Sequence, residues 1–127
     1  MASKKKNALP FDQRGSRIVF RTHFLNSDAY LTLSPQAKVL IQLLQMHWNN
    51  FKPVDYGVRE AAEKIPCAFG TARKAFNQLQ KRGFIVVKDY SVFSSTTENK
   101  ARSWRLTWLP FNSREPTNDW EKWTDKN

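Results

Sequence analysis

The segment of residues 71–87, TARKAFNQLQKRGFIVV, most constrains what this chain can fold into. It carries apolar side chains at the spacing of one helix face, namely Ala72, Ala75, Phe76 and Leu79. This periodicity predicts an amphipathic helix whose apolar face lies against a core. Gly83 is placed to terminate the helix, and the apolar residues after it predict a strand over 84–88. The segment therefore predicts a helix that turns directly into a strand.

The other face of this helix is polar and basic. It carries Gly70, Arg73, Lys74, Asn77, Gln78 and Lys81. Arg and Lys suit guanine O6 and N7, while Asn and Gln suit adenine N6 and N7. A solvated amphipathic face is the alternative interpretation of a single basic helix. The neighbouring elements help to decide between the two.

Two further helices precede this segment. Ser34 as N-cap and Pro35 at the first helical position predict a helix start, and the apolar residues that follow have helical spacing. Val39, Leu43 and Met46 widen its apolar stripe beyond what a surface helix needs, so this helix is either the central element of the core or also faces a second subunit. A second helix is predicted over 58–65, where the following proline ends it.

The remaining elements are strands and short turns. Residues 103–108, SWRLTW, alternate as a second strand, and the polar stretch 89–102 connects it to the first. Residues 17–21 predict a short strand, and residues 22–30 a helical turn capped by Thr22 or Ser27. The order of helix, helix, tight turn, helix and two-stranded ribbon predicts a mainly α fold with a small β-hairpin wing. This is the plan of an α+β winged helix-turn-helix.

The chain divides into three parts on this interpretation. Residues 1–16 are expected to form a flexible basic arm, because they lack periodicity. Residues 17–110 are expected to form the winged helix-turn-helix domain. Residues 111–127 are expected to be a C-terminal tail that docks through Trp120 and Trp123.

Charge gives the first indication of a partner. The formal net charge of the 127 residues is +10. Residues 1–21 carry +5 and residues 69–105 carry +6, while the rest of the chain is close to neutral. A polyanion is the natural partner of such a distribution, and nucleic acid is the commonest polyanion. The apolar-rich run 39–48 is too short to cross a bilayer, and no signal peptide is evident. Cys67 is the single cysteine, so a cytoplasmic, nucleoid-associated protein is expected.

Catalytic chemistry has little support in the sequence. His23 and His47 have no partner at metal-ligand or triad spacing, and one cysteine cannot build a zinc site. No glycine-rich phosphate-binding loop is present. We therefore expect no enzyme activity, no catalytic or metal site, no cofactor, no small-molecule ligand and no membrane partner.

Several stretches resemble a known family: LSPQAKVLIQLLQ, REAAEKI, TARKAFNQLQKRGFI, SWRLTWLP and PTNDWEKW. They are similar to small winged helix-turn-helix proteins encoded by bacterial plasmids and prophages, including replication-initiator and plasmid-regulator domains. The similarity extends over residues 20–123. It implies DNA binding without catalysis, in transcriptional regulation or replication. The family usually has a serine capping the recognition helix, where this chain has Ala68-Phe69-Gly70.

These inferences predict a sequence-specific double-stranded DNA-binding transcriptional regulator, a repressor encoded by a mobile element. Helix 71–82 is expected to read the major groove through Arg73, Lys74 and Asn77. Thr71 and Gln78 are expected to contact phosphates, with Gly70 allowing close approach and Lys81 and Arg82 giving electrostatic support. The wing, residues 88–103, is expected to contribute phosphate contacts, with Arg105 as a further candidate beside Lys88, Lys100 and Arg102.

A homodimer is predicted, through the over-apolar helix or the terminal arms, and it implies an inverted-repeat operator. Two alternatives to transcriptional regulation remain. One is a DNA-binding module for plasmid or phage replication initiation. The other is a winged-helix protein-interaction adaptor, which would bind random DNA feebly even at low salt.

Overall fold

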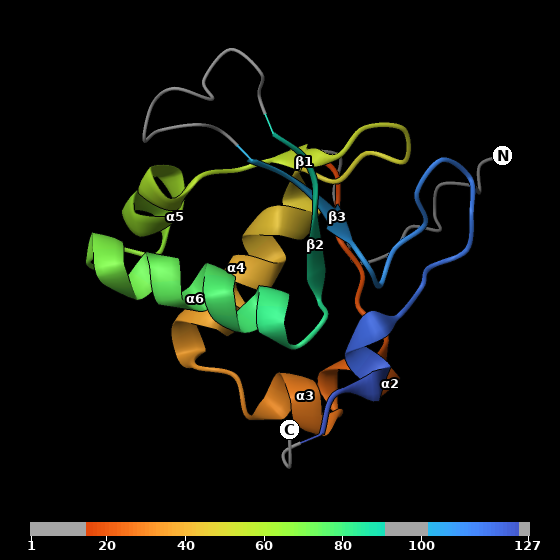
Figure 1. The fold of residues 1–127 in the computed structure, drawn as a ribbon, viewed down its shortest axis with the longest axis horizontal. Helices are drawn as coiled ribbons and strands as arrows, with labels where there is room; N and C mark the ends of the chain where they lie inside the picture. Colours follow the sequence, from red (N-terminus) through yellow and green to blue (C-terminus); the bar gives the residue numbers. More distant parts are fainter. Residues whose placement is uncertain (1–14, 91–101, 125–127) are drawn as a thin grey trace, which may run out of the picture.

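The computed structural model describes residues 15–90 and 102–124 of the chain. In this part it is an α+β fold of five α-helices and one three-stranded antiparallel sheet (Figure 1). The helices are α2 (Thr22–Leu25), α3 (Asp28–Leu31), α4 (Pro35–Met46), α5 (Val58–Lys64) and α6 (Phe69–Lys81). The strands are β1 (Val54–Asp55), β2 (Ile85–Tyr90) and β3 (Arg102–Leu106), and a 3-10 turn, η2 (Asp119–Lys122), follows. None of the helices in the described ranges has the length and apolar character needed to span a membrane.

Helix α4 lies behind α6 and supplies much of the core (Figure 1). The Ser34 hydroxyl accepts a hydrogen bond from the Ala37 N–H at 3.1 Å, and Pro35 is the first helical residue, so the predicted start is confirmed. Gln45 is a polar residue of this apolar-rich helix, and it is buried. Its amide donates to the Val19 carbonyl at 2.9 Å and accepts from the Trp108 indole N–H at 2.8 Å. Burial is possible because both ends of the amide are paired.

Residues 17–21 form no strand, so that prediction is wrong. No strand ladder forms here: the Val19 carbonyl accepts from the Gln45 side chain, and Phe20 stacks on Phe24 at 5.8 Å between ring centroids. The Ile18 and Val19 side chains are exposed. The predicted helical turn after them is confirmed as two short helices. The Ser27 hydroxyl caps α3 by accepting from the Tyr30 N–H.

Phe24 on α2 is the centre of an aromatic cluster. Its ring lies 5.5 Å from Phe84, 5.2 Å from Trp108 and 5.1 Å from Trp120, measured between centroids. These rings come from segments far apart in the chain, and α2, the residue before β2, the segment after β3 and η2 meet at this cluster. The aromatic pairs add about 0.5–1.5 kcal/mol each beyond area burial, so the cluster joins the C-terminal residues to the body. Trp120 is accordingly buried.

The sheet has β3 in its centre, paired with β1 on one side and β2 on the other. Trp104 and Leu106 on β3 are buried, as the alternation predicts. Trp108 lies beyond the strand. Strand β1 was not predicted, because a two-residue strand shows no alternation that a sequence pattern could reveal. The Asp55 carboxylate accepts a hydrogen bond from the Ser103 hydroxyl across this pairing.

Gly83 connects α6 to β2 and has a φ of +87°, in the left-handed region. The Phe84 N–H donates to the Leu79 carbonyl at 2.9 Å, and the Gly83 N–H to the Gln80 carbonyl at 3.1 Å. This pair of bonds is the Schellman motif, which glycine favours. The predicted termination is confirmed. The Thr107 hydroxyl also donates to the Gly83 carbonyl, so the residue that follows β3 holds the same turn.

Candidate nucleic-acid interface

Helix α6 is the element whose outward face carries the candidate contacts. Its four predicted inward residues, Ala72, Ala75, Phe76 and Leu79, are all buried. The helix packs against both α4 and α5, and the Phe76 ring stacks on Trp104 of β3 at 5.6 Å. Because one face is held by two helices and a strand, the opposite face is presented to solvent in a defined orientation.

The exposed face of α6 contains the predicted base-reading residues. Arg73, Lys74 and Asn77 are all exposed, as are Gly70 and Lys81. The helix contains no Asp or Glu, so none of its own carboxylates offsets these cations. Helical geometry places Gly70, Asn77 and Lys81 nearly opposite the buried stripe, with Arg73 and Lys74 on either side. The structure therefore brings five of the predicted residues onto one continuous surface.

Two of the predicted phosphate-contact residues lie on the flank of this surface. Thr71 and Gln78 are half-buried. The Gln78 side-chain oxygen accepts a hydrogen bond from the Ser34 N–H at 3.0 Å, so it satisfies the backbone where α4 begins. Gln78 thus connects α6 to α4, a function that the helical pattern of α6 alone does not reveal.

Arg82 contacts other parts of the fold, whereas from the sequence we expected it only to give electrostatic support to DNA binding. Its guanidinium donates to the Ala29 carbonyl at 2.7 Å and to the Thr32 hydroxyl at 2.6 Å. The same group lies 4.1 Å from the centroid of the Trp123 ring. Arg82 therefore joins the end of α6 to the end of α3 and to the C-terminal segment. Charge alone could not distinguish it from its neighbour Lys81.

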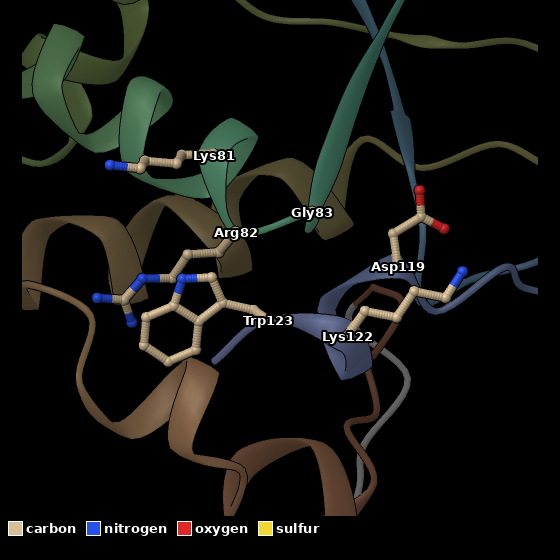
Figure 2. A pocket seen from close by; sticks show the side chains of 6 residues that line it. All are labelled: Lys81, Arg82, Gly83, Asp119, Lys122 and Trp123. Atoms are coloured by element: carbon tan, nitrogen blue, oxygen red, sulfur yellow. The ribbon is translucent and has the colours of Figure 1, made fainter. Parts of the chain in front are cut away.

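Figure 2 shows this arrangement around a pocket of about 240 Å³. Six residues line it, Lys81, Arg82, Gly83, Asp119, Lys122 and Trp123. The Arg82 guanidinium lies against the Trp123 ring, whereas the Lys81 side chain extends away from it (Figure 2). The pocket is smaller than the roughly 300–1,000 Å³ of typical small-molecule sites. The contact between Arg82 and Trp123 in its lining joins the end of α6 to the C-terminal segment.

The first turn of α6 lies at the edge of the exposed surface. Ala68 is the N-cap residue, and its side chain makes no capping hydrogen bond. The first helical bond runs from the Ala72 N–H to the Ala68 carbonyl. In any α-helix, the N–H groups of the first turn have no partner within the helix, and they favour an anion such as a phosphate. A Cβ added at Gly70 would meet nothing within 4 Å, so this surface is open.

Strands β2 and β3 supply a second group of cations. Lys88 on β2 and Arg105 on β3 both face Phe111, with the Lys88 Nζ 5.6 Å and the Arg105 Cζ 5.5 Å from the ring centroid. The β2–β3 register shifts between Val87 and Asp89, so a bulge occurs at Lys88. Bulges alter the direction of a strand and of its side chains. Phe111 therefore places two cations from different strands beside one ring.

Two other predicted wing residues cannot be placed in the same way. Lys100 lies outside the described residues. Arg102 begins β3, but its side chain is outside the part of the chain that the structure describes. Phe111 was not predicted as a member of the site. Its only signal in the sequence is an aromatic residue shortly after a strand that carries alternating cations.

The described ranges contain no cluster of metal-ligating side chains. No group of three or more His, Cys, Asp or Glu residues there could hold a metal ion. His23 instead contacts Glu121, with 3.3 Å between the imidazole Nε2 and a carboxylate oxygen, and His47 lies beside Tyr56. Burial raises the pKa of the Tyr56 hydroxyl, and the nearby Glu60 carboxylate raises it further, so this group stays neutral.

The comparisons with known proteins add no relative to this picture. Searches against protein-family models, curated proteins and solved structures found no match for the chain.

Proposed function

We propose that this chain is a winged helix-turn-helix protein that binds double-stranded DNA in a sequence-specific manner. Helices α4, α5 and α6 supply the three-helix unit, and β2 and β3 supply the wing. The packing of α6 on both preceding helices, followed by its direct turn into β2, supports this assignment. Fold alone does not establish a function, so the proposal depends on the surface chemistry of α6.

One observation carries the proposal. Arg73, Lys74, Asn77 and Lys81 are all exposed on an α6 face without acidic residues, while the other face of the same helix is fixed in the core. A helix fixed in this way can enter a major groove without reorganisation. Its Arg and Asn side chains have the donors and acceptors that read guanine and adenine edges. Thr71, at the first turn, is close enough to the helix start to contact a phosphate.

The wing would add contacts that do not depend on sequence. Lys88 and Arg105, held beside Phe111, are suited to the phosphate backbone next to the groove that α6 occupies. Phosphate contacts fix the register of a protein on the duplex, and base contacts specify the sequence. Because the two kinds of contact have different effects on binding, replacing one residue of each kind tests the proposal.

The function that fits such a domain best is transcriptional regulation, as a repressor that occupies an operator on a mobile element. The same DNA-binding unit would serve replication initiation if its site lay in an origin. Deleting the gene distinguishes the two, because a repressor changes the output of a promoter and a replication factor changes copy number.

Selection of bound sequences from a random duplex pool, followed by titration at several salt concentrations, tests the proposal. We expect a preferred sequence to emerge. Arg73→Ala should lose about 1–3 kcal/mol of discrimination at one base pair. Lys88→Ala should weaken binding to all sequences equally and lower the slope of log K against log[salt] by about 1.

Equal effects of the two variants on preferred and random duplexes would contradict the assignment of base-reading and phosphate-contacting residues. Feeble binding to every duplex, even at low salt, would contradict DNA binding itself and favour the protein-interaction adaptor. Both variants replace exposed side chains, so neither should lower the unfolding temperature.

We also propose that the protein is a homodimer joined through the outer face of α4. Val39 and Met46 are 39% and 61% exposed and lie two helical turns apart, on the side opposite the buried stripe. Half-buried Leu43 lies beside them. A two-fold dimer would bury this stripe against its copy and place two α6 helices on an inverted repeat.

Sedimentation equilibrium checks the dimer. Wild-type protein should have twice the chain mass, and Met46→Glu should shift it toward the monomer at the same concentration. Leu31→Glu on α3, which replaces a half-exposed apolar side chain away from the stripe, is the matched control and should leave the mass unchanged. A monomeric mass for wild-type protein up to high concentration would refute the dimer.

A further inference from the structure

The first residue of α6 is an exposed phenylalanine. Phe69 is 47% exposed and is not among the hydrophobic side chains that pack against the core. Its ring contacts a cation on the next helical turn: the Arg73 guanidinium carbon lies 4.8 Å from the ring centroid. A large apolar side chain in this position leaves much of its ring facing solvent.

The position of this ring indicates what it could contact. Phe69, Arg73 and Asn77 follow one another at successive turns, so they form a row that begins at the margin of the buried stripe and runs onto the exposed α6 surface. Gly70 and Lys74, beside it on that surface, are a glycine and a cation, and Pro66 and Ala68 just before it are also exposed. Phe69 is therefore the one large exposed apolar side chain of α6, next to a short apolar turn. A protein partner would favour a larger apolar patch. The major groove, in contrast, offers isolated apolar groups, which are the C5-methyl groups of thymine.

We propose that Phe69 and Arg73 together read a thymine next to a guanine. The Phe69 ring would pack on the thymine C5-methyl group, while the Arg73 guanidinium donates to O6 and N7 of the adjacent guanine. This inference rests on the proposed function, since it needs α6 to lie in the major groove. It adds a specificity-determining residue and a base step that the charge pattern of α6 does not supply.

The contact between the two side chains has a consequence for Arg73. A free arginine side chain loses much rotamer freedom when it forms a fixed pair of hydrogen bonds. The cation–π contact already restricts the guanidinium before DNA arrives. Phe69 is therefore also a positioning residue for Arg73, and its removal should weaken the guanine preference as well as the thymine preference.

Replacing thymine with deoxyuridine tests the contact directly, because it removes the C5-methyl group and leaves base pairing in place. In the duplex selected from the random pool, each thymine is replaced in turn and affinity is measured with wild-type protein, Phe69→Ala and Phe51→Ala. For wild-type protein, replacement of one thymine beside a guanine should weaken binding about fourfold, the effect of losing one buried methyl group. Phe69→Ala should bind the two duplexes equally.

Phe51→Ala is the matched control, because Phe51 is 67% exposed but lies in the segment between α4 and β1. It should keep the full deoxyuridine effect. Phe69→Leu should keep part of the effect, since leucine retains an apolar contact, and it guards against a general loss of helix structure in Phe69→Ala. Far-ultraviolet circular dichroism of all three variants should match that of the wild type.

The outcomes separate this inference from the proposed function. If a preferred sequence exists but no deoxyuridine replacement weakens wild-type binding, or the effect persists in Phe69→Ala, the reading of thymine by Phe69 is wrong and sequence-specific binding stands. If no preferred sequence emerges from the pool, sequence-specific binding fails, and this inference fails with it.

Discussion

Replacing Gly83 with alanine should lower the free energy of unfolding by about 2–4 kcal/mol. Two costs combine in this value. A side chain at a φ of +87° costs about 1–2 kcal/mol, because the Cβ crowds the backbone in the left-handed region. The new Cβ would also lie 3.0 Å from the carbonyl carbon and oxygen of Asp119, a tight contact that the η2 backbone relieves by shifting a few tenths of an ångström.

Urea unfolding followed by tryptophan fluorescence measures this change, and Gly70→Ala is its matched control. Gly70 lies in the first turn of α6, where an added Cβ meets nothing within 4 Å and alanine favours the helix. Gly70→Ala should therefore leave stability unchanged or raise it by up to about 1 kcal/mol. If the two variants had similar stability, the close approach between the α6–β2 turn and η2 would be wrong.

Replacing Arg82 with alanine should lower the free energy of unfolding by about 2 kcal/mol. The variant loses charge-assisted hydrogen bonds to the Ala29 carbonyl and the Thr32 hydroxyl, and it loses the cation–π contact with Trp123. The Ala29 carbonyl would be left at the end of α3 without this donor. Arg82 is half-buried, so solvent compensates part of the loss.

Lys81→Ala supplies the contrast for this prediction, because it removes the same charge from the adjacent residue. Lys81 is exposed and extends away from the pocket around Trp123 (Figure 2). We expect Lys81→Ala to change stability by less than about 0.5 kcal/mol and to lower DNA affinity at low salt. Thermal unfolding and salt-dependent titration of both variants check this. Equal loss of stability in the two would show that Arg82 is not the structural cation of the pair.

Local patterns in the sequence predicted the elements that are long and strongly periodic. The start of α4 at Ser34-Pro35, the buried stripe of α6 and its termination at Gly83 are all present. Each depends on interactions within a few residues, such as a cap, a helical repeat or a left-handed turn, so a short stretch of sequence contains the needed information. Strand β1 was missed because two residues contain no repeat.

Residues 17–21 show the opposite error. They contain a short apolar run, Ile18 to Phe20, but the Val19 carbonyl pairs with the side chain of Gln45 and not with a strand. That choice depends on α4, which is distant in the chain. The same applies to Gln45, a polar residue that is buried because Val19 and Trp108 satisfy both ends of its amide.

The polar residues of α6 also show what the sequence could predict and what depended on the tertiary structure. The helical repeat of α6 by itself determined that Arg73, Lys74 and Asn77 lie on the side opposite the apolar stripe, because that follows from the geometry of one helix. Only the tertiary structure decided which polar residues of α6 are already engaged. Gln78 accepts from Ser34, and Arg82 holds Ala29, Thr32 and Trp123. A side chain with charge or an amide can bind either a partner or its own fold, and this choice depends on groups that folding brings from distant parts of the chain.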